Sequence, residues 1–262
     1  MTSDEPHLIL RLAKDAQDLS AAQHLRYIVF VKELGADGPL VDHQKELEID
    51  AFDPYFDHLL LIDTRKDPNA GDHVVGVYRL LSPEKASAIG RYYCEDEFDL
   101  TALKASGRRL LELGRSCVAA PYRGGVAMLR LWAGLADYVI AQKIDVLFGA
   151  ASFFGTNLKA LDQPFSYLYH NHLAPPALFA RAIGHTRAEM NVIAKDKLDR
   201  KAAMLGTPAL IKAYLRLGGY VGDGAYIDHR FNSVDVLLVL DAGLMTERQR
   251  TLYARNAGAQ DG

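Results

Sequence analysis

The stretch from Glu112 to Trp132 has the residue types of a site for a phosphate or a pantetheine arm. A strand-like run ends in the turn Pro-Tyr-Arg-Gly-Gly at 121–125, and a helical pattern follows at once. Glycines at such a turn let the backbone approach a ligand closely, and a helix start offers free N–H groups and the positive end of its dipole. A plain strand–turn–helix connection has the same spacing, so this pattern alone does not decide between the two interpretations.

Six charged residues of the N-terminal half could together bind a charged amino acid. They are Arg26, Arg79, Arg115, Glu48, Asp50 and Asp53. A basic amino acid needs a carboxylate for its side-chain ammonium and a guanidinium for its own carboxylate. Arg79 and Arg115 fall in strand patterns, where a charge facing the interior needs a partner. A structural network of ion pairs is the main alternative, and a solvated loop is another for the acids.

Three other motifs are weak indications of catalysis or metal binding. A strand cysteine such as Cys117 is usually a small core residue, and no histidine lies in a pairing motif with it. His58 and Asp63 match a His-x4-Asp pattern, but their spacing in a strand puts the side chains on opposite faces. His170 and His172 lack further ligands nearby in the sequence. We therefore expect no metal site and no covalent enzyme intermediate.

The hydrophobic pattern predicts an α/β fold with a mixed sheet and helices on its faces. Strands are expected at 8–12, 58–63, 74–81, 110–119, 145–151 and 233–241, and helices at 15–31, 127–142 and 208–217. The second and third strands should form a hairpin, and a polar, acidic loop fills 35–57. We expect residues 1–262 to form a single domain, with an insertion of helices and loops at about 156–207.

Composition and charge exclude several classes of protein. Hydrophobic residues make up 49% of the 262 residues and charged residues 24%, which is ordinary for a globular domain. The net charge of −3 gives no case for nucleic-acid binding, and two cysteines are too few for a disulfide framework. We find neither a signal-peptide pattern nor an apolar run of about 18 residues. A cytoplasmic location is expected, and peripheral association with the inner membrane stays open.

A series of spaced motifs in the N-terminal half combines the charged residues with apolar ones. It runs Arg26, Phe30, Val31, then Glu48-Ile49-Asp50-x-Phe52-Asp53, then Val75-Gly76-x-x-Arg79-Leu80-Leu81, then Glu112-x-x-Arg115. This series resembles the signature of acyl-homoserine-lactone synthases, which share the core of the GNAT N-acyltransferases. The tryptophan usual shortly after the phenylalanine is missing, and Gly35 stands near its place. The C-terminal features of these synthases are missing as well, so such a signal synthase is kept as an alternative.

Four further motifs follow in order along the chain. They are Glu112-Leu-Gly-Arg-Ser-Cys-Val118 with Tyr122-Arg-Gly-Gly125 and Leu131-Trp-Ala-Gly-Leu135, then Phe148-Gly-Ala-Ala-Ser152-Phe-Phe-Gly155, then Pro208 to Gly218, and Gly222 to Val236. They resemble the ornithine Nα-acyltransferase family, often labelled hemolysin-like, over roughly Arg26 to Val239. This resemblance implies a GNAT-like mixed central sheet flanked by helices.

The resemblance also implies a reaction. It is transfer of a 3-hydroxylated acyl chain from acyl carrier protein to the α-amine of L-ornithine, giving lyso-ornithine lipid, the first step of ornithine lipid biosynthesis. The usual GNAT turn, Arg-Gly-x-Gly-x-Gly/Ala, is one residue longer than the turn at 123–127. A shortened turn should hold a nucleotide pyrophosphate poorly, so we expect the acyl-phosphopantetheine of the carrier protein as donor and no other cofactor. Another acyl-CoA-dependent N-acyltransferase is the second alternative.

Site residues follow from the same resemblance. The donor's thioester arm should lie along a splayed strand and the adjacent turn, at Cys117, Val118, Arg123, Gly124 and Gly125. The acceptor should be held by Arg26, Phe30, Glu48, Asp50, Asp53, Arg79, Arg115 and Ser152.

Glu112 is the candidate base, because it begins the donor strand and a carboxylate there can take the proton of the acceptor amine. An ion pair with Arg115 is the alternative, although their spacing requires a bulge for the two to share a face. Basic residues at 181–201 form either a solvated face or a docking patch for the acidic carrier protein or for anionic lipid.

Overall fold

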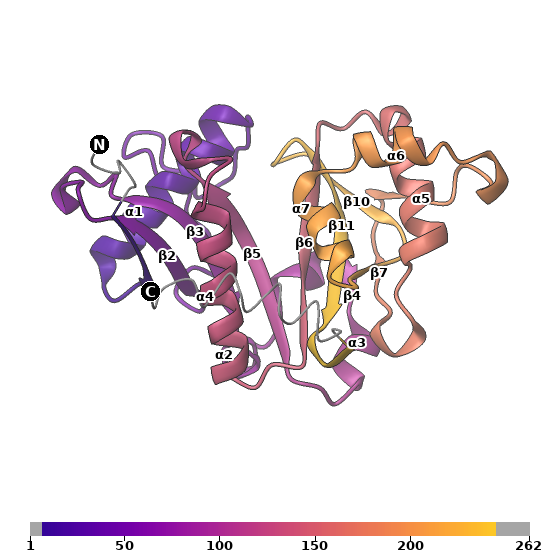
Figure 1. Ribbon diagram of the computed structural model, residues 1–262, viewed down its shortest axis with the longest axis horizontal. Helices are drawn as coiled ribbons and strands as arrows, with labels where there is room; N and C mark the ends of the chain where they lie inside the picture. Colours follow the sequence, from indigo (N-terminus) through magenta and orange to yellow (C-terminus); the bar gives the residue numbers. More distant parts are fainter. Residues whose placement is uncertain (1–6, 245–262) are drawn as a thin grey trace, which may run out of the picture. The chain divides into compact units, whose positions relative to one another are not determined.

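The computed structural model describes residues 7–244, which fall into two compact units (Figure 1). The first unit contains residues 7–85 and 113–143, and the second contains residues 86–112 and 144–244. The strand β5 (Leu110–Val118) begins in the second unit and ends in the first. This division does not test the expectation of a single domain, which stays a prediction.

The first unit is built on antiparallel strands covered by a helix on each face. Strands β1 (Leu8–Leu12), β2 (Asp57–Asp63) and β3 (Val74–Leu81) pair in that order, and β5 follows β3. Successive side chains of a strand point to opposite faces. In β2, Leu60 and Ile62 belong to the core beside α1 (Ala16–Arg26), and the intervening residues face α4 (Ala127–Ala141).

Local signals explain where both helices begin and how closely they pack. Asp15 caps α1 by accepting a hydrogen bond from the N–H of Asp18. The chain then continues as a π-helix over Tyr27–Glu33, a rare conformation that often marks functional sites. In α4, Gly134 permits close packing on β1, since an added Cβ would lie 2.2 Å from Leu10 Cδ2.

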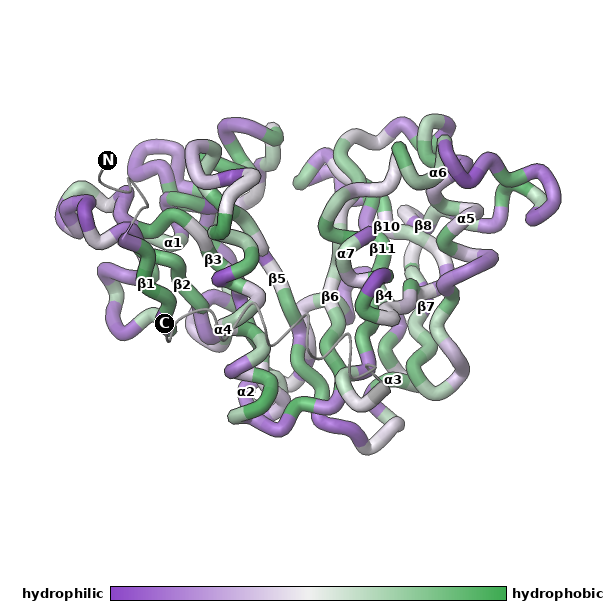
Figure 2. The backbone as a smooth tube through the Cα atoms, in the orientation of Figure 1, coloured by the Kyte–Doolittle hydropathy of each residue, from purple (hydrophilic) through white to green (hydrophobic). Residues whose placement is uncertain are grey.

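The second unit is a mixed sheet with helices and short strands around it. The start of β5 pairs in parallel with β6 (Val146–Phe154), which pairs antiparallel with β11 (Ser233–Asp241). Beyond β11 lie β10 (Ala225–Asp228) and β8 (Arg187–Ala188), and β9 (Tyr220–Val221) also pairs with β11. Strands β4 (Phe98–Asp99) and β7 (Arg181–Ala182) form a separate pair. Figure 2 shows β11 coloured as hydrophobic along most of its length, and all of its residues are buried.

The remaining helices are short. They are α2 (Pro83–Ile89), α3 (Thr101–Ala105), α5 (Asp162–His172), α6 (Arg200–Gly206) and α7 (Ala209–Arg216). The expected insertion at about 156–207 holds α5 and α6, which pack together, and also the short strands β7 and β8. Among residues 7–244, no helix combines the length and the apolar character needed to cross a membrane.

Most predicted elements are confirmed, three of them with unchanged bounds: the strands at 8–12, 74–81 and 233–241. The predicted mixed sheet flanked by helices is confirmed as well. Helices α2 and α3 and strand β10 were not predicted. Each is too short to show a helical or alternating period, and β10 follows a glycine-rich segment.

Candidate active site

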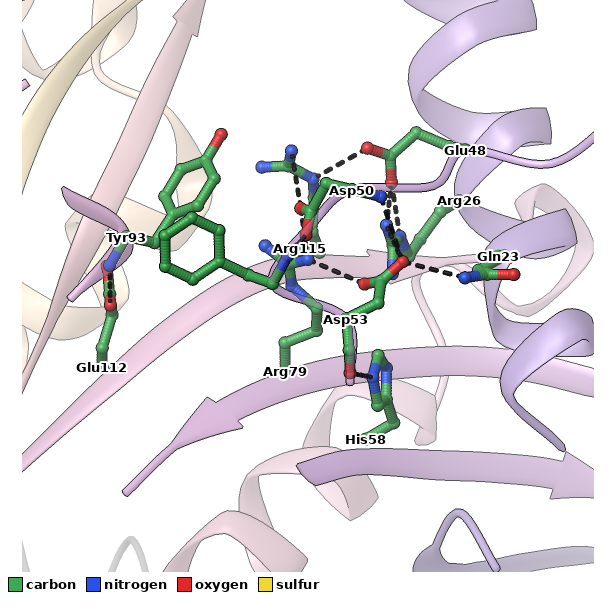
Figure 3. A network of polar contacts seen from close by, with 11 residues as sticks. Gln23, Arg26, Glu48, Asp50, Asp53, His58, Arg79, Tyr93, Glu112 and Arg115 are labelled. Atoms are coloured by element: carbon green, nitrogen blue, oxygen red, sulfur yellow. Dashed lines mark hydrogen bonds and ion pairs between the residues drawn. The ribbon is translucent and has the colours of Figure 1, made fainter. Parts of the chain in front are cut away.

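A buried network of ion pairs in the first unit joins the six charged residues singled out in the sequence (Figure 3). Arg26, the last residue of α1, is fully buried. Its Nη1 donates to Asp53 Oδ1 at 2.6 Å, and its guanidinium also pairs with Glu48. Burial disfavours the charged forms of both groups. Partners of opposite charge outweigh this effect, so the pKa of Arg26 is raised and that of Glu48 is lowered to about 2.

Arg79 of β3 is the second fully buried arginine of this network. Its Nη1 donates to Asp53 Oδ1 at 2.9 Å and also pairs with Asp50. Asp53 Oδ1 therefore bridges two guanidinium groups, and Asp53 Oδ2 accepts from Gln23 Nε2 at 2.9 Å. Burial alone would raise the pKa of Asp53, but Arg26 and Arg79 hold it well below its usual range. The aromatic ring of Phe56 lies 4.3 Å from Arg79 Cζ.

Asp50 and Arg115 form the accessible edge of the network. Their side chains are 16% and 12% exposed, whereas those of Glu48 and Asp53 are at most 3% exposed. Arg115 Nη2 lies 3.4 Å from Asp50 Oδ2, and Arg115 Nε lies 3.3 Å from Glu48 Oε1. These distances are long for charge-assisted hydrogen bonds, so these two contacts of Arg115 are weaker than the shortest contacts of Arg26 and Arg79.

The backbone of Arg115 is in the left-handed region, with φ of 50°. Such a conformation is uncommon for a residue other than glycine, and it interrupts the regular alternation of β5. The sequence required a departure from regular strand geometry if Glu112 and Arg115 were to share a face, and Glu112 instead accepts from the N–H groups of Tyr93 and Cys94. The local distortion thus brings the guanidinium of Arg115 to the acidic loop.

The acidic loop is itself braced by hydrogen bonds. Asp50 Oδ1 accepts from the N–H of Phe52 at 2.8 Å, and the N–H of Asp53 donates to the carbonyl of Asp50. His58 Nε2 lies 3.0 Å from the carbonyl oxygen of Asp53. Burial lowers the pKa of His58, so the neutral ring donates this bond through Nε2–H. The pattern of His58 and Asp63 was a weak indication of catalysis, and His58 instead contacts the backbone of Asp53.

The six side chains carry three positive and three negative charges, so the network is balanced without a ligand. The alternative of a structural ion-pair network therefore describes Arg26, Glu48, Asp53 and Arg79, which are buried against one another. Asp50 and Arg115 are the members through which a polar ligand could be contacted. A role of the network in acceptor binding stays a prediction. Phe30, predicted beside it, lies in the π-helix and packs partly buried against the core next to α1.

Glu112 lies in the second unit, where it is 1% exposed. Its Oε2 accepts from the N–H of Tyr93 at 2.7 Å (Figure 3). Its Oε1 accepts from the N–H of Cys94, also at 2.7 Å. These amides open the 3-10 helix Tyr93–Asp96, where backbone N–H groups lack partners within the helix. The carboxylate thus binds the start of this helix. Its role as a base stays a prediction.

The predicted donor turn lies between β5 and α4 in the first unit. Cys117 is buried in the core beside α1, and burial raises the pKa of its thiol to about 12, which disfavours a nucleophilic role. The carbonyl of Val118 accepts from Arg123 Nε at 2.8 Å. Gly124 has φ of 76°, which favours glycine, and the backbone at Gly125 has room, since an added Cβ would meet nothing closer than 3.8 Å.

Ser152 lies in β6 of the second unit, half-buried, with Asp235 of β11 as its cross-strand partner. Asp235 is close to Asp228 and Glu97, since one carboxylate oxygen of each lies within 4.8 Å of the others. Asp235 Oδ1 also accepts from Ser233 Oγ at 3.0 Å. Sequence reasoning missed this acidic group. Asp228 and Asp235 share one motif, but Glu97 stands far from it in the chain and in no motif.

Comparisons with known proteins show which family the chain is similar to. Residues 25–133 match the family model described as an acetyltransferase (GNAT) domain. An L-ornithine Nα-acyltransferase of Rhodobacter capsulatus is 56% identical over 246 residues, covering 94% of both chains. An L-ornithine Nα-acyltransferase of Agrobacterium fabrum is 38% identical, covering 94% of this chain and 85% of that protein.

A solved structure shares the fold. A CoA-dependent acyl-homoserine lactone synthase, BjaI, solved with SAM and isopentyl-CoA, superposes with a TM-score of 0.51 at 14% identity. The match covers 92% of this chain and 83% of that one. The expectation of a GNAT-like fold is thereby confirmed, and so is the resemblance to the ornithine acyltransferases.

Proposed function

The chain belongs to the family of the L-ornithine Nα-acyltransferases, and from this membership we propose its complete reaction. The chain transfers a 3-hydroxylated acyl group from acyl carrier protein to the α-amine of L-ornithine. The product is lyso-ornithine lipid. We propose a cytoplasmic location for the protein. Because the product carries a long acyl chain, we also propose contact with the inner-membrane surface.

The chemistry is direct attack of the amine on the acyl thioester. The C–N bond forms as the C–S bond breaks, and the thiol of the phosphopantetheine leaves with a proton. The ammonium form of the acceptor must first lose a proton, and Glu112 is the proposed acceptor, directly or through a water molecule. After the attack the nitrogen gives up a second proton, which the leaving thiolate takes. The buried thiol of Cys117 is not needed, because this route has no covalent enzyme intermediate.

Acceptor recognition is the part that the geometry supports best. The single observation that carries it is the accessible edge, Asp50 and Arg115, on an otherwise buried and balanced network. The α-carboxylate of ornithine can pair with the Arg115 guanidinium, and its side-chain ammonium can pair with the Asp50 carboxylate. A zwitterion with an extra cation thus meets one charge of each sign, at an edge where the distance of 3.4 Å between Arg115 Nη2 and Asp50 Oδ2 is long for an ion pair.

The donor proposal is supported by the shortened turn between β5 and α4. A carrier protein presents its pantetheine with a single phosphate on a folded partner, so the turn has no nucleotide to hold. Exposed basic side chains in the insertion, including Lys195, Lys197, Arg200 and Lys201, are compatible with an acidic partner.

Lipid mass spectrometry tests the proposal as a whole. The gene is expressed in a bacterium without ornithine lipids, and the extracted lipids are compared with those of the empty host and of an Asp50→Asn strain. We expect a new N-acylated ornithine that is reduced in the variant. Accumulation of an acyl-homoserine lactone without acyl-ornithine would refute the proposal.

A further inference from the structure

We propose that Arg123 is a positioning residue of the donor turn rather than a ligand of the donor phosphate, and that Tyr122 assists it. The side chains of both residues hold the turn at 121–125 against other parts of the first unit. This inference rests on the proposed function, since that function assigns the pantetheine arm to this turn. An arginine in a glycine-rich turn before a helix would otherwise be expected to bind phosphate directly.

Arg123 uses its guanidinium within the chain. Its Nε donates to the carbonyl of Val118 at 2.8 Å, and its Nη2 donates to Glu33 Oε2 at 2.7 Å. The side chain therefore links the last residue of β5 to the last residue of the π-helix. Glu33 neutralises the charge of Arg123, and a phosphate brought to the same group would face the Glu33 carboxylate.

Tyr122 makes a second link from the neighbouring position. Its hydroxyl donates to Asp63 Oδ2 at 2.7 Å, and Asp63 ends strand β2. Asp63 is 1% exposed and also accepts from Arg65 Nη2 at 2.9 Å, so this end of the link is fixed. Partial burial and the Asp63 carboxylate raise the pKa of Tyr122 to about 12, so the hydroxyl keeps its proton at working pH.

These links act where the backbone must be placed accurately. Gly124, with φ of 76°, comes directly after Arg123, and α4 begins at Ala127. Val126, at the N-cap of α4, has an apolar side chain, and the first N–H groups of a helix have no partners within the helix. The backbone donors offered to a pantetheine arm are therefore aimed by the side chains of Tyr122 and Arg123.

The variant Glu33→Gln separates positioning from phosphate binding. If Arg123 positions the turn, Glu33→Gln and Arg123→Gln should each raise the donor KM by about 3- to 10-fold with the acceptor KM unchanged. The double variant should be no worse than the worse single variant, because both changes break one link. If Arg123 binds phosphate, Arg123→Gln raises the donor KM while Glu33→Gln leaves it unchanged or lowers it, and that result overturns the inference.

Tyr122→Phe has a matched control in Tyr138→Phe. Tyr138 of α4 donates its hydroxyl to Asp57 at 2.8 Å, and Asp57 keeps Lys85 as a partner at 2.7 Å, as Asp63 keeps Arg65. Tyr122→Phe should raise the donor KM, and Tyr138→Phe should not. Equal donor KM values in the two variants would overturn the second link.

Hydrogen exchange of the turn gives a readout that does not depend on the reaction. Amides of residues 123–127 should exchange faster in Glu33→Gln and Tyr122→Phe than in the wild type and in Tyr138→Phe. Unchanged exchange in both variants would overturn the inference even if the enzyme acylates ornithine. Faster exchange in a protein that does not acylate ornithine would instead support the links and refute the proposed function.

Discussion

At the scale of single residues, burial separates side chains that share one motif. Asp53 is buried between two arginines and Gln23, whereas Asp50 sits three residues away at the edge of the network. Both were predicted to bind the acceptor on equal terms. The geometry divides their roles. Replacing Asp53 takes a carboxylate from both Arg26 and Arg79, whereas replacing Asp50 takes one from Arg79, which keeps Asp53, and also changes the charge at the edge.

We predict that Asp50→Asn raises the ornithine KM by roughly 10- to 150-fold, because a charge-assisted hydrogen bond is worth about 1.5–3 kcal/mol. The donor KM should change little. Steady-state kinetics with each substrate varied in turn measures this, and Asp53→Asn is the matched control. That control should lower the melting temperature more than Asp50→Asn does, because it takes a partner from two buried arginines instead of one. A lower melting temperature of Asp50→Asn with an unchanged ornithine KM would refute the recognition role.

We predict that Glu112→Gln lowers turnover by about 10²- to 10⁴-fold, the usual effect of losing a general base. The amide offers one oxygen to the N–H groups of Tyr93 and Cys94, so some loss of stability is expected as well. The assay is therefore run well below both melting temperatures, and the acid limb of the kcat/KM profile should disappear. Near wild-type turnover in the folded variant would rule Glu112 out as the base.

The residue types of the site could be predicted from the sequence, but their division into buried and accessible members could not. The spacing of Glu48, Asp50 and Asp53 shows a shared motif and says nothing of which carboxylate meets Arg26. The role of His58 was hidden for a related reason, because its contact is with a backbone carbonyl. A backbone partner leaves no trace in the side-chain pattern.

At the scale of elements, long apolar patterns were predictable and local departures from regular geometry were not. Strand β3 and helix α4 bury continuous apolar surface, so their period is visible in the sequence. The π-helix at Tyr27–Glu33 keeps a helical pattern of apolar residues and was expected as part of one helix. The left-handed backbone of Arg115 has no signature of its own, although the preceding Gly114 allows a close approach to Arg79.

We predict that Gly134→Ala destabilises the protein although alanine favours helices. The new methyl group would lie 2.2 Å from Leu10 Cδ2 and 3.4 Å from Leu59 Cδ1, so α4 or Leu10 must shift. Overpacking of this kind costs about 1–3 kcal/mol, more than the gain in helix propensity of about 1 kcal/mol. Urea unfolding measures the difference, with the more open Gly38→Ala as control. An increase in stability for Gly134→Ala would contradict the packing seen between α4 and β1.

At the scale of the whole molecule, segments distant in the sequence meet in one charged network within the first unit. The acidic loop before β2 reaches arginines of α1, β3 and β5, so the integrity of this unit depends on charge balance. Composition and net charge gave no sign of such a network. The order of the motifs indicated the family. Several separated motifs in the same order identify a family specifically, whereas each motif alone does not.

We predict that stability falls as the pH drops from about 4.5 towards 2. The folded-state pKa of Glu48 is lowered from 4.5 to about 2, so its contribution is present above 4.5 and is lost as it becomes protonated below. Burial lowers the pKa of His58, which acts in the same direction below 6.5. Thermal melting from pH 2 to 7 measures this. Glu48→Gln should be less stable at pH 7 and less sensitive to acid, and an identical pH slope in both proteins would contradict the account.

The rate of ornithine acylation with two matched donors tests the central claim most directly. The purified protein is given L-ornithine with a 3-hydroxyacyl carrier protein or with CoA bearing the same acyl chain, and Nα-acylornithine is measured by mass spectrometry. We predict that the acyl group is transferred to the α-amine, as the family name implies. We also predict a clearly higher kcat/KM with the carrier-protein donor than with acyl-CoA. An equal or higher kcat/KM with acyl-CoA, or acylation of another amine in preference to ornithine, would contradict the account.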